Sequence, residues 1–450
     1  ARQPAALLQV SAGAGCRTTT APPARRHCQA PLWRARLGRR APRGDAARGL
    51  SPSPLRTAGS FLLSRVQQIG IFIALVVIVL LFQGLTGGRL LTAGNVANII
   101  VQNSYILILA IGMVMIIIAG HIDLSVGSVA AFVGAATGVM VVQWGWPWWL
   151  AIVVGIVLGA VVGAWQGFWV AVVGIPAFIV TLAGMLIFRG LTQITLSNTQ
   201  ITPFPAEYRQ LGGGYLFPQL FPASTSPAEW ITVGLGLLTL VLFVGSQLRG
   251  RHKRVKLGVE GEPAWWFWTR VGFGALLIVL LTYLLGIAEG SRGTPIVLIV
   301  LGALIVAYSV VMQRTRFGRH IYAVGGNRHA ADLSGIRSKR IDFMLFVNVG
   351  MLAALAGIVF TGRLNSAGPG AGNLFELDAI AAAFIGGAAV QGGIGTVVGA
   401  ITGGLIMGVL NNGMSLMGVS TDYQQFIKGM VLLLAVAFDV YNKRRARSLG

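Results

Sequence analysis

The residues of this chain that could do chemistry are a few ionisable and polar side chains between apolar spans. His121, Asp123 and Ser125 lie within one short break between two such spans. Ionisable groups near membrane depth are costly, so they are usually paired or functional. Asp123 and Ser125 can accept the orphan N–H groups of the helix that starts after them. The pattern predicts a capped helix break that turns the chain near the cytoplasmic face, with a proton or substrate relay and a contact to a partner as alternatives.

Uncharged polar side chains within or beside the apolar spans form a second group of candidates. A neutral polyol that crosses a membrane needs hydrogen-bond donors and acceptors. The alternative use of such side chains is a hydrogen bond between neighbouring helices. The candidates for a translocation path are Gln102 and Asn103 before the second span, Gln166 in the fourth, Asn348 in the ninth, and Asn411 and Asn412 at the end of the eleventh.

A long basic loop at 314–340 contains the most patterned polar segment of the chain. Within it, apolar residues at helical spacing, flanked by glycines, predict a short helix with one apolar edge. Such an element suits docking to a soluble partner, and the alternative is a solvated connector whose basic residues only fix orientation. The predicted docking residues are Gly325, Asn327, Ala330, Ala331, Leu333, Ser334, Gly335 and Ile336.

The sequence carries no signature of an enzyme. It contains no phosphate-binding loop, not even a Gly-Lys pair, and no nucleophile elbow. It also lacks the His and Cys spacings of a metal site. We therefore expect no catalytic residue, no metal and no cofactor bound by this chain. If transport is driven by ATP, another subunit must hydrolyse it.

Composition predicts an all-α, polytopic helical membrane protein. Mean hydropathy is +0.74, with 55% hydrophobic and 11% charged residues. Spans of about 20 apolar residues match the hydrocarbon core, and they are too continuously apolar for barrel strands. We predict about twelve transmembrane helices, or ten to eleven if a short span is re-entrant. The spans are 68–84, 104–120, 123–142, 148–170, 176–195, 230–247, 270–287, 294–312, 343–361, 376–390, 396–413 and 424–440.

Loop charge predicts the orientation of these spans. The basic loops at 249–256 and 314–340 and the tail at 442–447 should lie in the cytoplasm. Twelve spans place all of them on one side and both termini inside. The spans within about 230–290 are interpreted as an inserted helix pair, whose Trp-rich connection is expected to act as an interfacial anchor.

The first 58 residues differ from the rest. They hold eleven arginines against a single acid, Asp45, and both cysteines, Cys16 and Cys28. We interpret 1–58 as a disordered or artefactual leader, and 65–445 as the membrane domain. Outside the leader the basic charge lies in short loops without interleaved aromatic residues. Nucleic acid is therefore not an expected partner.

Four ordered motifs, Gly120–Ser128, Gly174–Met185, Gly325–Ile336 and Phe384–Thr396, together carry a family resemblance. The chain resembles the permease subunits of bacterial monosaccharide ABC importers, the ribose, xylose, arabinose and galactose group. Branched-chain amino-acid permeases are more distantly similar. The resemblance covers roughly 65–445, and the length and inserted helix pair look most like the xylose-type permease.

The resemblance implies a mechanism in the bacterial inner membrane. Two permeases would form the path between them, two cytoplasmic ATPases would bind below, and a sugar-binding protein would dock outside. The 325–336 element would be the coupling helix, inserting Ala330, Ala331, Leu333 and Ile336 into the ATPase. Family members commonly carry an acidic residue or proline where this chain has Arg328-His329.

Two other functions remain open at the level of sequence. A proton-coupled secondary carrier would use Asp123 or Glu376, although the ionisable residues cluster near span ends. An ion pair between Glu376 and Arg363 is the structural expectation there. A branched-chain amino-acid ABC permease would need charged contacts in its path for a zwitterionic ligand.

Overall fold

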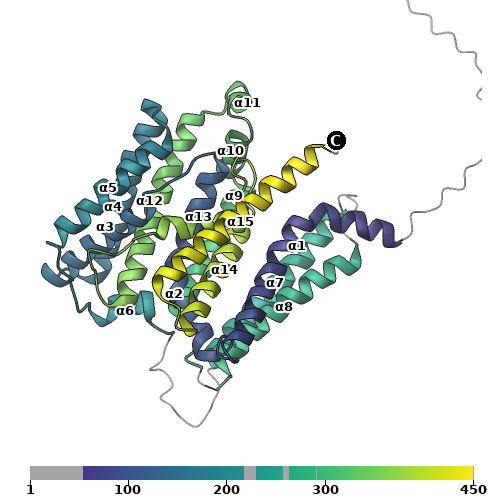
Figure 1. The fold of residues 1–450 in the computed structure, drawn as a ribbon, viewed down its shortest axis with the longest axis horizontal. Coiled ribbons are helices and arrows are strands. Elements are labelled where there is room, and N and C mark those ends of the chain that lie inside the picture. Colours follow the sequence, from purple (N-terminus) through teal and green to yellow (C-terminus); the bar gives the residue numbers. More distant parts are fainter. Residues whose placement is uncertain (1–53, 217–229, 257–262, 290, 449–450) are drawn as a thin grey trace, which may run out of the picture. The chain divides into compact units, whose positions relative to one another are not determined.

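Helices make up every long regular element in the part of the chain that the structure describes. The computed structural model describes residues 54–216, 230–256, 263–289 and 291–448, in which helices are joined by loops and β pairing is limited to isolated bridges such as Ile201 with Ala367 (Figure 1). The all-α prediction is therefore confirmed. The predicted leader lies almost entirely outside the described residues.

The helices run along the chain in an order that matches the predicted spans. They are α1 (Pro54–Leu85), α2 (Ala93–Ile118), α3 (Val126–Gly138), α4 (Trp148–Gly167), α5 (Ala177–Thr195), α6 (Ala206–Gly213), α7 (Trp230–Lys256), α8 (Ala264–Gly286), α9 (Ile296–Arg314), α10 (Arg316–Gly326), α11 (Arg328–Leu333), α12 (Ser338–Leu364), α13 (Phe375–Ile385), α14 (Val397–Leu416) and α15 (Thr421–Ser448). Two π-helical turns, η1 (Val139–Gln143) and η2 (Phe168–Val173), extend α3 and α4.

Nine helices of the described residues are long and apolar enough to cross a membrane. The three remaining predicted spans fall on the apolar part of α1, Gly70–Leu85, on α13 and on α15. With eleven residues, α13 is only about 16 Å long, which is too short for a hydrocarbon core of about 30 Å. The chain is thus a multi-pass membrane protein in which α13 covers part of the membrane thickness.

The second helix lies at the centre of the bundle. The most apolar stretch of α2 is 89% buried, and α12, α13 and α14 pack against it. A helix that is apolar on all sides is expected inside a bundle. It begins at Ala93, not near residue 104 as predicted. The expected start was wrong because the amides of Gln102 and Asn103 interrupt the apolar run without interrupting the helix.

Close packing of α4 on α12 depends on paired glycines. A Cβ atom on Gly159 would lie 2.4 Å from the carbonyl oxygen of Gly350, and one on Gly350 would lie 2.1 Å from that of Gly159. Small residues let two backbones approach in this way inside membranes. The α4–α12 contact therefore fixes α12, whose first turns carry the site described below.

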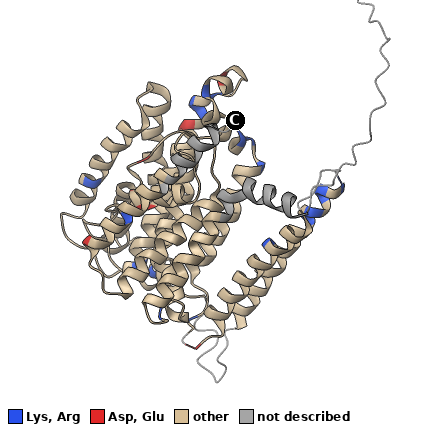
Figure 2. Cartoon of the chain, turned by 45° about the vertical axis from the view of Figure 1, so that its right-hand side comes forward, with Lys and Arg blue, Asp and Glu red and all other residues tan. Residues whose placement is uncertain are grey.

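Helices α7 and α8 pack chiefly on each other, and Phe72 of α1 contacts Phe273 of α8. Only 6% and 17% of their most apolar stretches are buried, so most of their apolar surface lies on the outside of the bundle. Figure 2 shows that acidic residues are sparse along the described part of the chain. The last turn of α7 is basic, with Lys253, Arg254 and Lys256.

Candidate functional site

The short helix predicted in the basic loop is α11, and local signals set both of its ends. The side chain of Asn327 accepts a hydrogen bond from the backbone N–H of Ala330 at 3.0 Å, which is an N-cap. At the other end Gly335 has a φ of +82°, and Ile336 N–H donates to the carbonyl of Ala331 at 3.1 Å. This is a Schellman motif, in which glycine supplies the left-handed residue.

The four apolar residues predicted to enter a partner do not share one face. Leu333 is 77% exposed and Ala330 is exposed, whereas Ala331 is buried and Ile336 is half-buried against the bundle. Residues three apart lie on one side of a helix, and the Schellman turn folds Ile336 back toward Ala331. The expected insertion of Ala331 into a partner was therefore wrong, whereas that of Ile336 stays a prediction. The exposed edge is Ala330 with Leu333.

The end of α10 is fixed against the end of α2. A Cβ atom on Gly325 would lie 1.6 Å from the carbonyl oxygen of Ile118, so only glycine fits there. The same carbonyl accepts a hydrogen bond from Gly393 N–H at 2.8 Å. The hydroxyl of Tyr322 donates to the carbonyl of Gly395 at 2.7 Å. The loop helices are thus attached to α2 and to the segment 386–396 that precedes α14.

A buried carboxylate connects α11 to the helix break. Asp342, in the second turn of α12, is fully buried and accepts a short hydrogen bond from the guanidinium of Arg328, the first residue of α11. Nε2 of His121 lies 3.2 Å from the other carboxylate oxygen, without hydrogen-bond geometry. We refer to Asp342, Arg328 and His121 as the Asp342 cluster. These residues come from three segments. A displacement of α11 would therefore move Arg328 and, through Asp342, change the contact with His121 at the end of α2.

Asp342 was missed in the sequence analysis, as was the role of Arg328. The available signal was an acid directly before the apolar span 343–361, at the end of a basic loop. Arg328 stood out only as a departure from the family pattern, and its ion pair with Asp342 now accounts for it.

A second polar contact attaches the end of α11 to the start of α12. The hydroxyl of Ser338 donates to the carboxylate of Asp332. That hydrogen bond, with smaller contributions from Arg328 and His329, holds the pKa of Asp332 below its usual value. The carboxylate therefore stays ionised at neutral pH and accepts this bond.

A pocket of about 490 Å³ opens beside the Asp342 cluster. Its walls come from the break after α2, from the connection between η2 and α5, and from the basic side chains His121, Arg328 and Lys339. It gives the cluster access to the surface next to α11.

The helix break contains a buried network. The carboxylate of Asp123 accepts from Ser125 N–H at 2.8 Å and from the Ser125 hydroxyl at 2.6 Å. The amide of Gln166 donates to the same hydroxyl oxygen at 2.6 Å. The expected cap by Ser125 was wrong, because its side chain makes no cap bond to α3 and is held by Asp123 and Gln166 instead.

The other candidates for a translocation path do not converge with Gln166. Asn103 donates to the carbonyl of Ile99, and Asn412 exchanges hydrogen bonds with Asn95 of α2. Asn348 donates to the hydroxyl of Tyr308 at 2.8 Å.

The backbone carbonyl oxygen of Gln102 accepts a hydrogen bond from the guanidinium of Arg363 at 2.9 Å, and Asn411 is half-buried. Arg363 makes no ion pair with Glu376, so that expectation was wrong. Among the neighbouring acids it is Asp378 that is paired, with Lys428 at 3.1 Å.

Comparison with known proteins decides the family. A model of the family described as branched-chain amino acid transport system, permease component, matches residues 95–436. The chain belongs to this permease family.

Named relatives of the permease cover most of its length. It is 42% identical to the xylose transport system permease protein of Escherichia coli K12 over 393 residues, which are 87% of this chain and 96% of the relative. It is 39% identical to the xylose transport system permease protein of Haemophilus influenzae, over 83% of this chain and 96% of the relative.

It is also 35% identical to the ribose import permease protein of Bacillus subtilis, over 83% of this chain and 92% of the relative. No solved structure matches it.

Proposed function

We propose that this permease is the membrane-spanning subunit of an ABC importer that carries a monosaccharide, with a xylose-type pentose as substrate. The observation that carries the proposal is the 42% identity to a xylose transport system permease protein over nearly the whole of both chains. The sequence lacks a phosphate-binding loop, so the ATPase would be a separate cytoplasmic subunit. This chain would bind no cofactor of its own.

The proposed assembly follows the charge of the loops. With the basic loops inside the cell, both termini lie in the cytoplasm of a bacterium, and the protein lies in the inner membrane. Two copies of the permease would form the path between them. A sugar-binding protein would dock on the outer face and release its sugar into this path.

The contact with the ATPase would be made by the exposed edge of α11. Ala330 and Leu333 are the apolar side chains that project from the loop, and Leu333 is 77% exposed. An exposed leucine on a short, doubly capped helix suits insertion into a groove of a soluble partner. Movement of α11 would be passed through Arg328 to Asp342 and the end of α2.

A second candidate, import of a branched-chain amino acid, is supported by the description of the family model. It makes a different demand on the path, because a zwitterion needs a counter-charge for each of its ends. The neutral candidates for the path fit a polyol better.

The test is transport by purified components. The permease, with the ATPase and binding protein encoded beside it, is reconstituted into liposomes, and ATP-dependent uptake of labelled xylose, ribose and leucine is followed. We expect xylose uptake that requires ATP. Leu333→Asp should abolish the uptake, and the matched variant Leu333→Met, which keeps an apolar side chain of similar volume, should retain it.

Each alternative has its own outcome. Leucine uptake without sugar uptake would establish the amino-acid permease. Uptake that persists without the ATPase would establish a secondary carrier. Full activity of Leu333→Asp would refute the coupling role of α11 while leaving the substrate open.

A further inference from the structure

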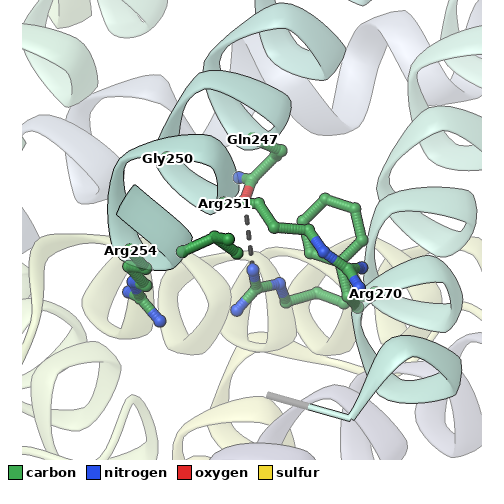
Figure 3. Close-up of a pocket in the computed structure, with 7 residues that line it drawn as sticks. Gln247, Gly250, Arg251, Arg254 and Arg270 are labelled. Carbon is green, nitrogen blue, oxygen red and sulfur yellow. Dashed lines mark hydrogen bonds between the residues drawn. The ribbon is translucent and has the colours of Figure 1, made fainter. Parts of the chain in front are cut away.

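A pocket of about 110 Å³ lies between the basic ends of α7 and α8 (Figure 3). Three guanidinium groups from two helices line it, and none of the described residues in its lining is acidic. The lining residues are Gln247, Gly250, Arg251, Arg254, Val255, Phe267 and Arg270. Neither the coupling helix nor the candidate path contributes to this pocket, so its role does not rest on the proposed function.

Helical spacing brings these side chains to one face of α7. Gln247, Arg251 and Arg254 are separated by four and three residues, so they lie above one another on the side that faces α8. Gln247 in turn accepts a hydrogen bond from the guanidinium of Arg270 at 3.1 Å. The arginines are therefore held by the fold of the helix pair.

The guanidinium of Arg251 is held in place, and one of its hydrogen-bond donors is available for a ligand. Its guanidinium stacks over the ring of Phe267 at 4.6 Å from the centroid, and the ring itself is buried. Nη1 of Arg251 is buried and has no hydrogen-bond partner among the described residues. A buried donor on a cation costs free energy when it has no acceptor, so this position is suited to an acceptor that carries negative charge.

The surroundings indicate where such an acceptor would come from. Most of the apolar surface of α7 and α8 lies on the outside of the bundle, and Trp265 and Trp268, in the first turns of α8, are 46% and 57% exposed. Tryptophan in that position settles at the depth of the lipid headgroups. Phe267, which lines the pocket, lies between these two tryptophans in the sequence, so we place the pocket at the depth of the phospholipid phosphates.

We propose that this pocket binds the phosphate of an anionic phospholipid headgroup. A planar guanidinium matches two phosphate oxygens, and several of them neutralise one phosphate better than a zwitterionic headgroup, whose own cation they would repel. Basic pockets between membrane helices are suited to anionic headgroups. Exposed apolar side chains of α7, such as Leu242, would contact the acyl chains, which a free phosphate lacks.

A bound headgroup would also join the two helices. Arg251 lies on α7 and Arg270 on α8, so one phosphate held between them would attract both helices. The lipid would thus hold the basic ends of the pair together in a region with few contacts to the rest of the bundle.

The test is lipid binding by the purified full-length chain, measured by native mass spectrometry in detergent. Phosphatidylglycerol is titrated against phosphatidylcholine, with soluble glycerol phosphate as a competitor. We expect Arg251→Gln to weaken the binding of phosphatidylglycerol about tenfold, the effect of losing one charge-assisted hydrogen bond. Arg249→Gln, which removes the same charge from an exposed position of α7 outside the pocket, should change it less than about twofold.

Three results would overturn the proposal. Equal losses in Arg251→Gln and Arg249→Gln would show a general basic surface without a pocket. Equal binding of phosphatidylcholine would exclude recognition of negative charge, and displacement of the lipid by glycerol phosphate would assign the pocket to a soluble anion. Arg251→Lys keeps the charge and should bind at an intermediate level, which separates loss of binding from loss of fold.

Discussion

Removing the cation of the Asp342 cluster should destabilise the permease more than removing its anion. The side chain of Asp342 is 1% exposed, whereas that of Arg328 is 45% exposed. Arg328→Gln would leave a buried carboxylate with only His121 beside it. Asp342→Asn would leave a guanidinium that can turn toward water, and the new amide oxygen could still accept its hydrogen bond.

The difference can be given a magnitude. Breaking a fully buried ion pair by removing one partner costs about 3–5 kcal/mol. We expect Arg328→Gln to lower the free energy of unfolding by about 3 kcal/mol, because it leaves the buried carboxylate of Asp342 without its partner. We expect Asp342→Asn to lower it by about 1 kcal/mol, because the guanidinium that remains can turn toward water. In the double variant no charge is left buried, so Arg328→Gln should then add less than about 1 kcal/mol, a coupling of about 2 kcal/mol.

The assay is equilibrium unfolding of the purified chain in mixed micelles for the wild type, both single variants and the double variant. ATP-dependent xylose uptake by the same four proteins tests whether the pair also couples. Additive single effects would refute the reasoning, because they would mean that Arg328 and Asp342 do not stabilise each other. So would an Arg328→Gln variant as stable as the wild type within about 0.5 kcal/mol.

Three further predictions concern the helices that hold the site. Gly335→Ala places a Cβ at a φ of +82°, so it should lower the free energy of unfolding by about 1 kcal/mol and reduce uptake. The control Gly326→Ala lies at ordinary φ with open space around it and should be neutral in both assays. Gly163→Ala would place a Cβ 2.3 Å from a carbonyl oxygen of α12, so unfolding should show a loss of about 2 kcal/mol or more. Replacing both Asn95 and Asn412 by alanine should cost about 1 kcal/mol in the same assay with substrate preference unchanged, and altered preference would place Asn412 in the path.

Sequence reasoning succeeded where the signal is local. Hydropathy identified twelve helices because a span needs only its own apolar side chains. The short helix in the basic loop could be predicted because its stop, Gly335, lies next to it in sequence. Boundaries were less accurate where polar residues such as Asn103 are satisfied inside a helix by their own backbone.

What the sequence by itself determined about this protein is therefore its class, its helices and, through ordered motifs, its family. The tertiary structure decided which side chains of α11 face outward, because Ala331 is buried where α11 packs against α10 and α12. It also decided the role of Asp342, whose contact with His121 joins residues more than two hundred positions apart, and brought Arg270 to Arg251 across the α7–α8 pair. Such pairings depend on how helices pack against each other, and helix packing is set by long-range contacts that no single stretch of sequence contains.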